Sequence, residues 1–168
     1  MTAGIGKGLL FLACLWLGLE RSRRRKKRTA CLRAFRQAVA DLGRDMGFSL
    51  EPLDRLVERL SGQGGAVASF FAACEAEFAR SGRESWAEAW DRALAQSRLP
   101  LQETDRVLLA RVGEILGRWD GETQQRALGE CLARLDERIF DGAQEEQRLF
   151  RVDMALGVTA GLFCVLLL

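Results

Sequence analysis

The fold is decided by the stretch Thr29-Ala-Cys-Leu-Arg-Ala-Phe-Arg-Gln-Ala-Val-Ala-Asp-Leu-Gly-Arg-Asp-Met46. Its large apolar side chains recur at spacings of three and four residues, at Leu32, Phe35, Val39, Leu42 and Met46. This spacing places them on one face of an α-helix and leaves the charged side chains on the other faces. Because such a helix needs other helices to cover its apolar face, the stretch predicts a helical bundle.

Further apolar stripes with helical spacing follow up to residue 151, without the alternation that is typical of strands. Helix-breaking signals separate them, at Gly47, Pro52, 61–65, Gly82, Pro100 and Asp120-Gly121. Ser85 and Glu88 have the spacing of a capping box at a helix start. We therefore predict an all-α fold, an antiparallel bundle of about six helices within 21–151, whose long last helix can continue into the C-terminal apolar run.

Apolar runs at both ends predict transmembrane helices that flank this bundle, at 1–20 and 152–168. The first run has twelve uncharged residues in succession and the second has fifteen, whereas a span needs about 20. We expect Lys7 to reach the interface, and Arg148, Arg151 and Asp153 to lie near the headgroups. A cleaved signal peptide is the alternative for the first run, but the cations follow this run instead of preceding it. A buried core helix is the alternative for the second run, but no polar residue caps it.

A basic segment, 21–28, directly follows the first apolar run. It has seven cations in eight residues: Arg21, Arg23, Arg24, Arg25, Lys26, Lys27 and Arg28. Cations next to a span stay on the cytoplasmic side, so we expect a cytoplasmic helical domain at 21–151 and both termini across the membrane. The segment is also suited to anionic lipid headgroups. Nucleic-acid binding is the alternative, and the adjacent anchor disfavours it.

Glycines recur four residues apart in both apolar runs, at Gly4 and Gly8 and at Gly157 and Gly161. This pattern lets helices approach closely in lipid, within one chain or between chains. Glycine is also common in membrane helices, so the pattern leaves both interpretations open. Gly113 and Gly117 show the same spacing and predict a close helix crossing in the bundle.

The composition argues against an enzyme. The chain has no His, which removes the commonest general base and zinc ligand, and its five Cys are scattered like buried hydrophobic residues. The carboxylate pairs Glu75/Glu77 and Glu145/Glu146 fall on polar helix faces, where we expect them to be solvated. We therefore predict a non-enzymatic protein with no catalytic residue, no cofactor and no metal site.

Several strings, in their order along the chain, resemble the stage III sporulation protein AB family of endospore-forming bacteria. Leu116-Gly117-Arg-Trp-Asp120 followed by Gln124 is similar to a family string between the fifth and sixth helices, and Leu156-Gly157-Val158 with Gly161 is similar to the start of its last span. The order of anchor, basic cluster, helical domain and anchor also agrees. Trp119 and Leu149-Phe150-Arg151 depart from the family pattern.

The resemblance implies a fold and a role. It implies a helical domain similar to the cytoplasmic domains of the type II secretion F platform protein. It also implies a membrane platform subunit of the channel between mother cell and forespore, on the mother-cell side, in the outer forespore membrane. The implied partners are the companion AA ATPase, other subunits of the channel and membrane lipid, with no nucleic acid; self-association stays open. The alternative is a membrane-tethered helical adaptor or lipid-binding module outside sporulation.

Overall fold

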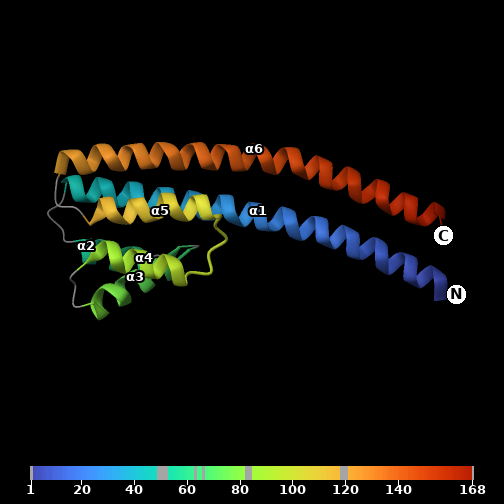
Figure 1. Ribbon diagram of the computed structural model, residues 1–168, viewed down its shortest axis with the longest axis horizontal. Helices are drawn as coiled ribbons and strands as arrows, with labels where there is room; N and C mark the ends of the chain where they lie inside the picture. The colour runs from blue at the N-terminus through green and yellow to red at the C-terminus, as the bar shows by residue number, and fades with distance from the viewer. Residues whose placement is uncertain are drawn as a thin grey trace. The chain divides into compact units, whose positions relative to one another are not determined.

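The computed structural model describes residues 2–48, 53–62, 64–65, 67–81, 85–117 and 121–167, and for most of 2–18 and 153–167 it describes the backbone alone. These residues form six helices (Figure 1): α1 (Thr2–Phe48), α2 (Leu53–Gly62), α3 (Ala68–Arg80), α4 (Trp86–Gln96), α5 (Glu103–Leu116) and α6 (Gly121–Leu167). The predicted all-α class and helix number are confirmed for this part of the chain. α6 is continuous, as expected, and so is α1, which joins the first apolar run, the basic segment and the first bundle helix.

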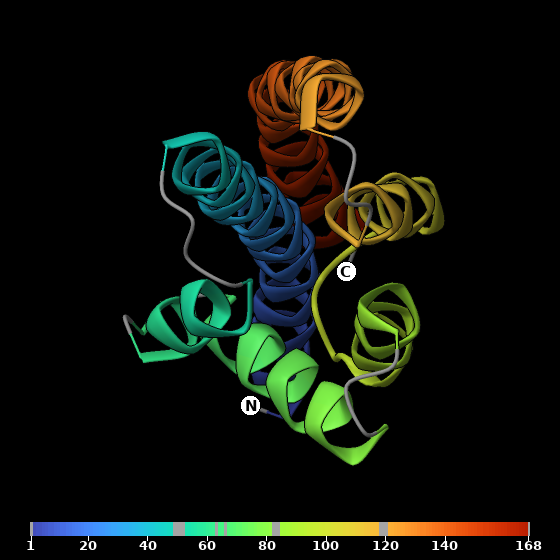
Figure 2. The same ribbon diagram turned by 90° about the vertical axis from the view of Figure 1, so that its left-hand side faces the viewer.

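The chain divides into two compact units. We call Ala30–Ile139 the helical domain, and we call Met1–Thr29 with Phe140–Leu168 the two-helix unit. In the helical domain, consecutive helices from α2 to α5 pack against one another. Seen end-on, α2 to α6 follow one another around α1 (Figure 2). The apolar face of α1 is consequently covered, as the spacing of its apolar residues predicts.

Aromatic rings fill the centre of the helical domain. Phe35 of α1, Phe70 and Phe71 of α3, and Trp90 of α4 are almost completely buried. The Phe35 and Phe70 rings meet edge to face with their centroids 5.0 Å apart, and the Phe70 and Trp90 rings do so at 4.8 Å. Burial of one such ring stabilises a fold by roughly 1.5–3 kcal/mol, so this cluster holds α1, α3 and α4 together.

Within the helical domain, α1 and the first part of α6 run antiparallel. Arg36 donates two hydrogen bonds of 3.0 Å to the carboxylate of Asp136. Further along α1, the space beside Gly43 is filled by the side chain of Leu128, which lies 2.5 Å from where a Cβ would stand. The absence of a side chain at Gly43 therefore allows α6 to lie close to α1.

Side chains close several helix ends in the helical domain. The Ser85 hydroxyl accepts a hydrogen bond from the backbone N–H of Glu88, which confirms Ser85 as the cap of α4. Asp105 accepts one from the backbone N–H of Gln102 at the start of α5, a cap that our sequence analysis missed. The Arg106 guanidinium donates to the carbonyl of Leu94, at the end of α4. These caps satisfy backbone groups that the helices leave unpaired.

The two-helix unit is an antiparallel pair. Lys26 Nζ lies 5.9 Å from the ring centroid of Phe150, and Thr29 lies beside Gly142. In this unit the N-terminal end of α1 and the C-terminal end of α6 lie side by side (Figure 1).

In the part of the chain that the structure describes, no helix is both long and apolar enough to cross a membrane. The transmembrane helices predicted at 1–20 and 152–168 therefore find no support in that part of the structure. These two predicted segments consist largely of residues whose side chains the structure does not describe. The predicted packing at Gly4, Gly8, Gly157 and Gly161 lies among the same residues.

Candidate functional site

The structure divides the basic segment of α1 into two classes. Arg25 and Arg28 are half-buried, three residues apart, and therefore share one face of the helix. The other cations are exposed to solvent: Arg21, Arg23, Arg24, Lys26 and Lys27. The division arises because α6 covers one side of α1 in the two-helix unit.

The half-buried face of α1 packs closely on α6. Thr29 is only 2% exposed, and its hydroxyl donates to the carbonyl of Arg25 at 3.3 Å. A Cβ on Gly142 would lie 3.0 Å from Thr29 Oγ1 and 3.7 Å from Arg28 Nη1. Gly142 thus lets α6 approach this face, and we expect Arg25 and Arg28 to serve the packing of the pair more than its surface.

Exposed hydrophobic side chains gather in the same unit. Trp16 is 68% exposed, and Leu19, Phe150, Val152 and Leu156 are exposed as well. A soluble surface seldom concentrates large apolar side chains in this way, and such a concentration marks an interaction site. The five residues lie on both helices, next to the exposed cations in sequence.

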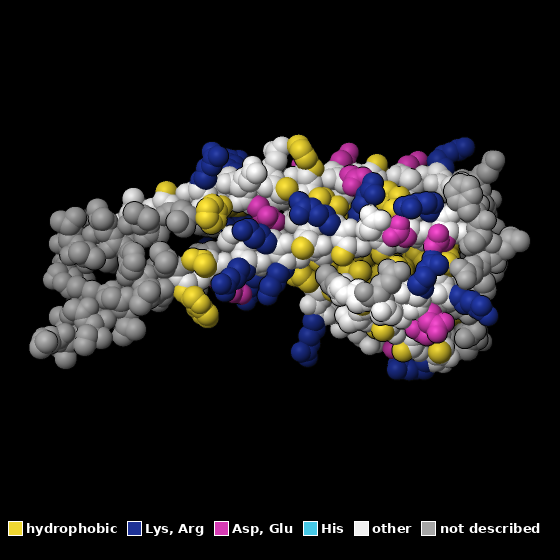
Figure 3. Space-filling model, turned by 180° about the vertical axis from the view of Figure 1, so that it is seen from behind, with side chains coloured by type: hydrophobic (Ala, Val, Ile, Leu, Met, Phe, Trp, Pro, Cys, Tyr) yellow, Lys and Arg dark blue, Asp and Glu magenta, His cyan; other side chains and the backbone are white. Residues whose placement is uncertain are grey.

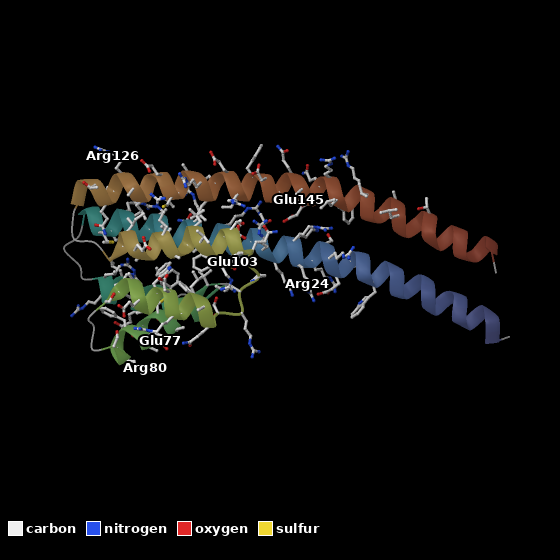
Figure 4. All side chains as sticks on the ribbon, viewed as in Figure 1. Arg24, Glu77, Arg80, Glu103, Arg126 and Glu145 are labelled. Atoms are coloured by element: carbon white, nitrogen blue, oxygen red, sulfur yellow. The ribbon has the colours of Figure 1, made fainter. Side chains whose placement is uncertain are left out.

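We call these apolar residues and the neighbouring exposed cations the collar. Its cations are Arg21, Arg23, Arg24, Lys26, Lys27, Arg148 and Arg151. Lys and Arg side chains and hydrophobic side chains stand next to one another on the described part of the long helices (Figure 3). Arg24 projects from α1 on the side turned away from α6 (Figure 4), and it pairs with the exposed carboxylate of Glu20, at 3.4 Å. The collar thus offers apolar and cationic groups together, a combination suited to a membrane surface.

The described residues that carry the resemblance, Leu116, Gly117 and Gln124, lie where α5 meets α6 and α4. Gln124 of α6 donates from Nε2 to the carbonyls of Ile115 (2.9 Å) and Leu116 (3.3 Å), which are among the last carbonyls of α5. A Cβ on Gly117 would lie 3.5 Å from the backbone nitrogen of Ala87 in α4. Asp120 lies outside the described residues. Gln124 therefore acts structurally, by capping α5, and Gly117 lies where even a Cβ would be at ordinary contact distance from α4.

Gly113 lies at a close contact between helices, as its spacing from Gly117 predicts, and the group that approaches it is the side chain of Trp90 in α4. A Cβ there would lie 2.3 Å from Cδ1 of Trp90. The indole N–H of Trp90 donates to the carbonyl of Leu109 at 2.8 Å. Trp90 therefore packs against α5, and Gly113 leaves the room for its side chain.

The prediction that Glu77 is solvated is wrong. Glu77 is 5% exposed, and its carboxylate accepts a hydrogen bond of 2.7 Å from Arg80 (Figure 4) and lies 3.4 Å from Nε of Arg92 in α4. α4 covers this face of α3, which the periodicity of α3 alone did not reveal. The two guanidinium groups compensate the buried charge, so Glu77 joins α3 to α4.

The described thiols lie in the core. Cys31, Cys74 and Cys131 are free and buried. Burial, together with the charge of Asp105, raises the pKa of Cys31 to about 11, and burial raises the pKa of Cys74 and of Cys131. These thiols stay protonated and unreactive at neutral pH. Among the side chains open to description, no cluster of His, Cys, Asp and Glu could hold a metal ion.

Comparisons with known proteins match almost the whole chain by sequence and 73% of it by structure. The family model described as stage III sporulation protein AB matches residues 3–168. A curated relative, stage III sporulation protein AB of Bacillus subtilis (strain 168), is 26% identical over 167 residues, which are 98% of this chain and 97% of the relative. A solved structure of stage III sporulation protein AB (SpoIIIAB) is 24% identical, with a TM-score of 0.67, and the match covers 73% of this chain and 98% of that chain. The structural match shows that the fold is shared.

Proposed function

Because the chain belongs to the stage III sporulation protein AB family, we propose that it is a membrane-attached assembly subunit of the sporulation machinery. Membership in this family implies a role in sporulation, so the alternative of an adaptor outside sporulation is set aside. The family consists of sporulation assembly subunits and is not a known class of enzyme. The work of such a subunit is done by its surfaces.

The collar is the observation that carries the proposal of membrane attachment. Its exposed tryptophan and aliphatic side chains stand where each long helix enters the apolar run at its end of the chain. Aromatic side chains favour the boundary between headgroups and hydrocarbon, and cations favour the headgroups. In this proposal the apolar runs 8–19 and 154–168 enter the bilayer next to each other, because the two-helix unit is an antiparallel pair.

The position of the cations then sets the orientation. Arg21 to Arg28 lie between the first apolar run and the helical domain, so this domain would stay on the cytoplasmic side of the membrane. In a sporulating cell this would be the mother-cell side of the outer forespore membrane. This assignment rests on the charge pattern and on the resemblance stated above.

The helical domain would be a platform for partner subunits. It is an all-α unit with one hydrophobic core, and a packed unit of this kind can present helix surfaces to other chains. By the same resemblance, the partners would be the companion AA ATPase and other membrane subunits of the stage III sporulation channel.

Co-purification tests this function. The full chain, carrying an affinity tag, is solubilised from membranes of sporulating cells in a mild detergent, and the recovered proteins are identified by mass spectrometry. We expect the AA ATPase and other stage III subunits to be enriched relative to the same tag on an unrelated membrane protein. Recovery of the folded chain without these subunits would contradict the proposed role.

A further inference from the structure

We infer that the exposed cations of the collar form a binding site for the phosphate groups of anionic phospholipids, and that Arg25 and Arg28 are not part of it. This inference rests on the proposed membrane attachment and adds a lipid class to it. The structure contributes the division of the basic segment into exposed and half-buried cations, which its composition alone does not show.

The exposed cations are crowded and largely uncompensated along α1. Residues 21–27 rise by only about 9 Å along a helix, and five of the seven are exposed cations. Between Glu20 and Asp41 the sequence contains no acidic residue. Glu20 pairs with Arg24 in the open, where such a pair contributes little. Like charges at this density repel one another, and bound anions relieve that repulsion.

Cations of α6 extend the site. Phe150 lies next to Lys26, and Arg148 and Arg151 flank Phe150 in sequence and are exposed. Three acidic residues of this part of α6, Asp141, Glu145 and Glu146, precede Arg148, and one, Asp153, follows Arg151. In the antiparallel pair the first three lie toward the Thr29 end of the unit, so the exposed cations Arg148 and Arg151 lie nearer to the chain ends than these three carboxylates.

The depth of the collar suits lipid. Trp16 precedes Arg21 by five residues, or about 8 Å along the helix. The headgroup layer on each side of a bilayer is roughly 5–8 Å thick. A tryptophan at the edge of the hydrocarbon therefore places Arg21 among the phosphates and the other exposed cations of α1 within about 9 Å beyond it along the helix, where the surface charge of anionic lipid still attracts them. Anionic lipid thus satisfies the tryptophan and the cations at once. A nucleic acid would pair with the cations but would leave Trp16 and Leu156 exposed to water.

Fluorescence quenching by brominated lipids tests the site in the full chain. The chain is held in detergent micelles that contain equal amounts of phosphatidylglycerol and phosphatidylcholine, with bromine on one lipid or on the other. Because the composition is the same in both samples, the ratio of the two quenching efficiencies measures which lipid collects beside Trp16. The Trp16→Phe variant identifies the contribution of Trp16 to the signal.

We expect brominated phosphatidylglycerol to quench Trp16 at least about threefold more than brominated phosphatidylcholine at low salt, since each basic residue near an anionic surface adds about fivefold in affinity before mutual screening. The ratio should approach one at high salt. It should also approach one in the triple variant Arg23→Glu, Arg24→Glu, Lys27→Glu. The matched variant Arg111→Glu, Arg126→Glu, Arg134→Glu reverses three exposed cations of the helical domain and should keep the preference.

Other results would overturn the inference. Strong and equal quenching by both lipids would refute the headgroup preference while leaving the membrane attachment standing. Absence of quenching by either lipid would contradict the attachment itself, and with it the proposed function. The division into two classes would be refuted if Arg25→Gln lost the preference for phosphatidylglycerol while the triple variant kept it. A short DNA duplex that binds through Arg23, Arg24 and Lys27, with equal quenching by the lipids, would assign these cations to nucleic acid.

Discussion

Replacing Gly113 with Ala should destabilise the helical domain, although alanine is the better helix former. The new Cβ would lie 2.3 Å and 2.4 Å from two ring atoms of Trp90 and 2.9 Å from its Cβ. The last contact matters most, because a Cβ cannot rotate away. The Trp90 ring is also confined by Phe70 at 4.8 Å and by its hydrogen bond to the Leu109 carbonyl. α4 and α5 would therefore have to separate.

The size of the effect follows from three contributions. Overpacking of a core costs about 1–3 kcal/mol. Disturbing the Trp90 hydrogen bond, so that a buried donor loses its partner, costs about 1–3 kcal/mol. The higher helix propensity of alanine offsets about 1 kcal/mol. The net loss of unfolding free energy is about 1–5 kcal/mol, which lowers Tm by roughly 2–20 °C in a chain of this size.

Thermal unfolding of the full chain in detergent, followed by tryptophan fluorescence, measures this loss. Gly129→Ala is the matched control, because a Cβ at Gly129 meets nothing within 4 Å and the position is exposed. The control should be as stable as the original chain or up to about 1 kcal/mol more stable. A Gly113→Ala variant as stable as this control would refute the packing of Trp90 on α5.

Gln124→Ala should lower the unfolding free energy by about 1–2 kcal/mol in urea titration, because the last carbonyls of α5 lose their cap, whereas Gln125→Ala on the exposed face should have no effect. Raising the pH from about 9 through 11 should lower stability, because the folded pKa of Cys31 is raised above its ordinary value and the unfolded thiol ionises first. The chain has no Tyr to ionise in the same range, so Cys31→Ala should visibly reduce the fall of the unfolding free energy with pH. An equal fall in this variant would contradict ionisation of Cys31 as a cause. Gly157→Leu combined with Gly161→Leu should weaken cross-linking to partner subunits while leaving the unfolding of the helical domain unchanged, and intact cross-linking would contradict close packing at these glycines.

Much of the helical domain could be predicted from the apolar periodicity alone. Leu32, Phe35, Val39 and Leu42 form the buried face of α1 as predicted. The spacing of Gly113 and Gly117 predicts a close contact, and the structure places the ring of Trp90 beside Gly113. These features depend on local spacing, which the sequence displays directly.

Features that depend on a second helix could not be predicted in this way. Glu77 is buried because α4, with Arg92, covers a polar face of α3. The basic segment shows no internal sign that Arg25 and Arg28 differ from their neighbours, since the difference arises from α6 and Gly142. The cap at Asp105 was missed because a Gln-x-x-Asp start is a weak signal beside the usual Ser or Thr.

Alkaline carbonate extraction tests the central claim most directly, namely that both ends of the chain hold it in a membrane. Membranes from cells that express the full chain are washed with carbonate, which releases peripheral proteins, and are then sedimented. We predict that the chain sediments with the membranes and that the helical domain is digested by protease only when the cytoplasmic face is accessible. Release of the intact chain into the carbonate supernatant would contradict the account.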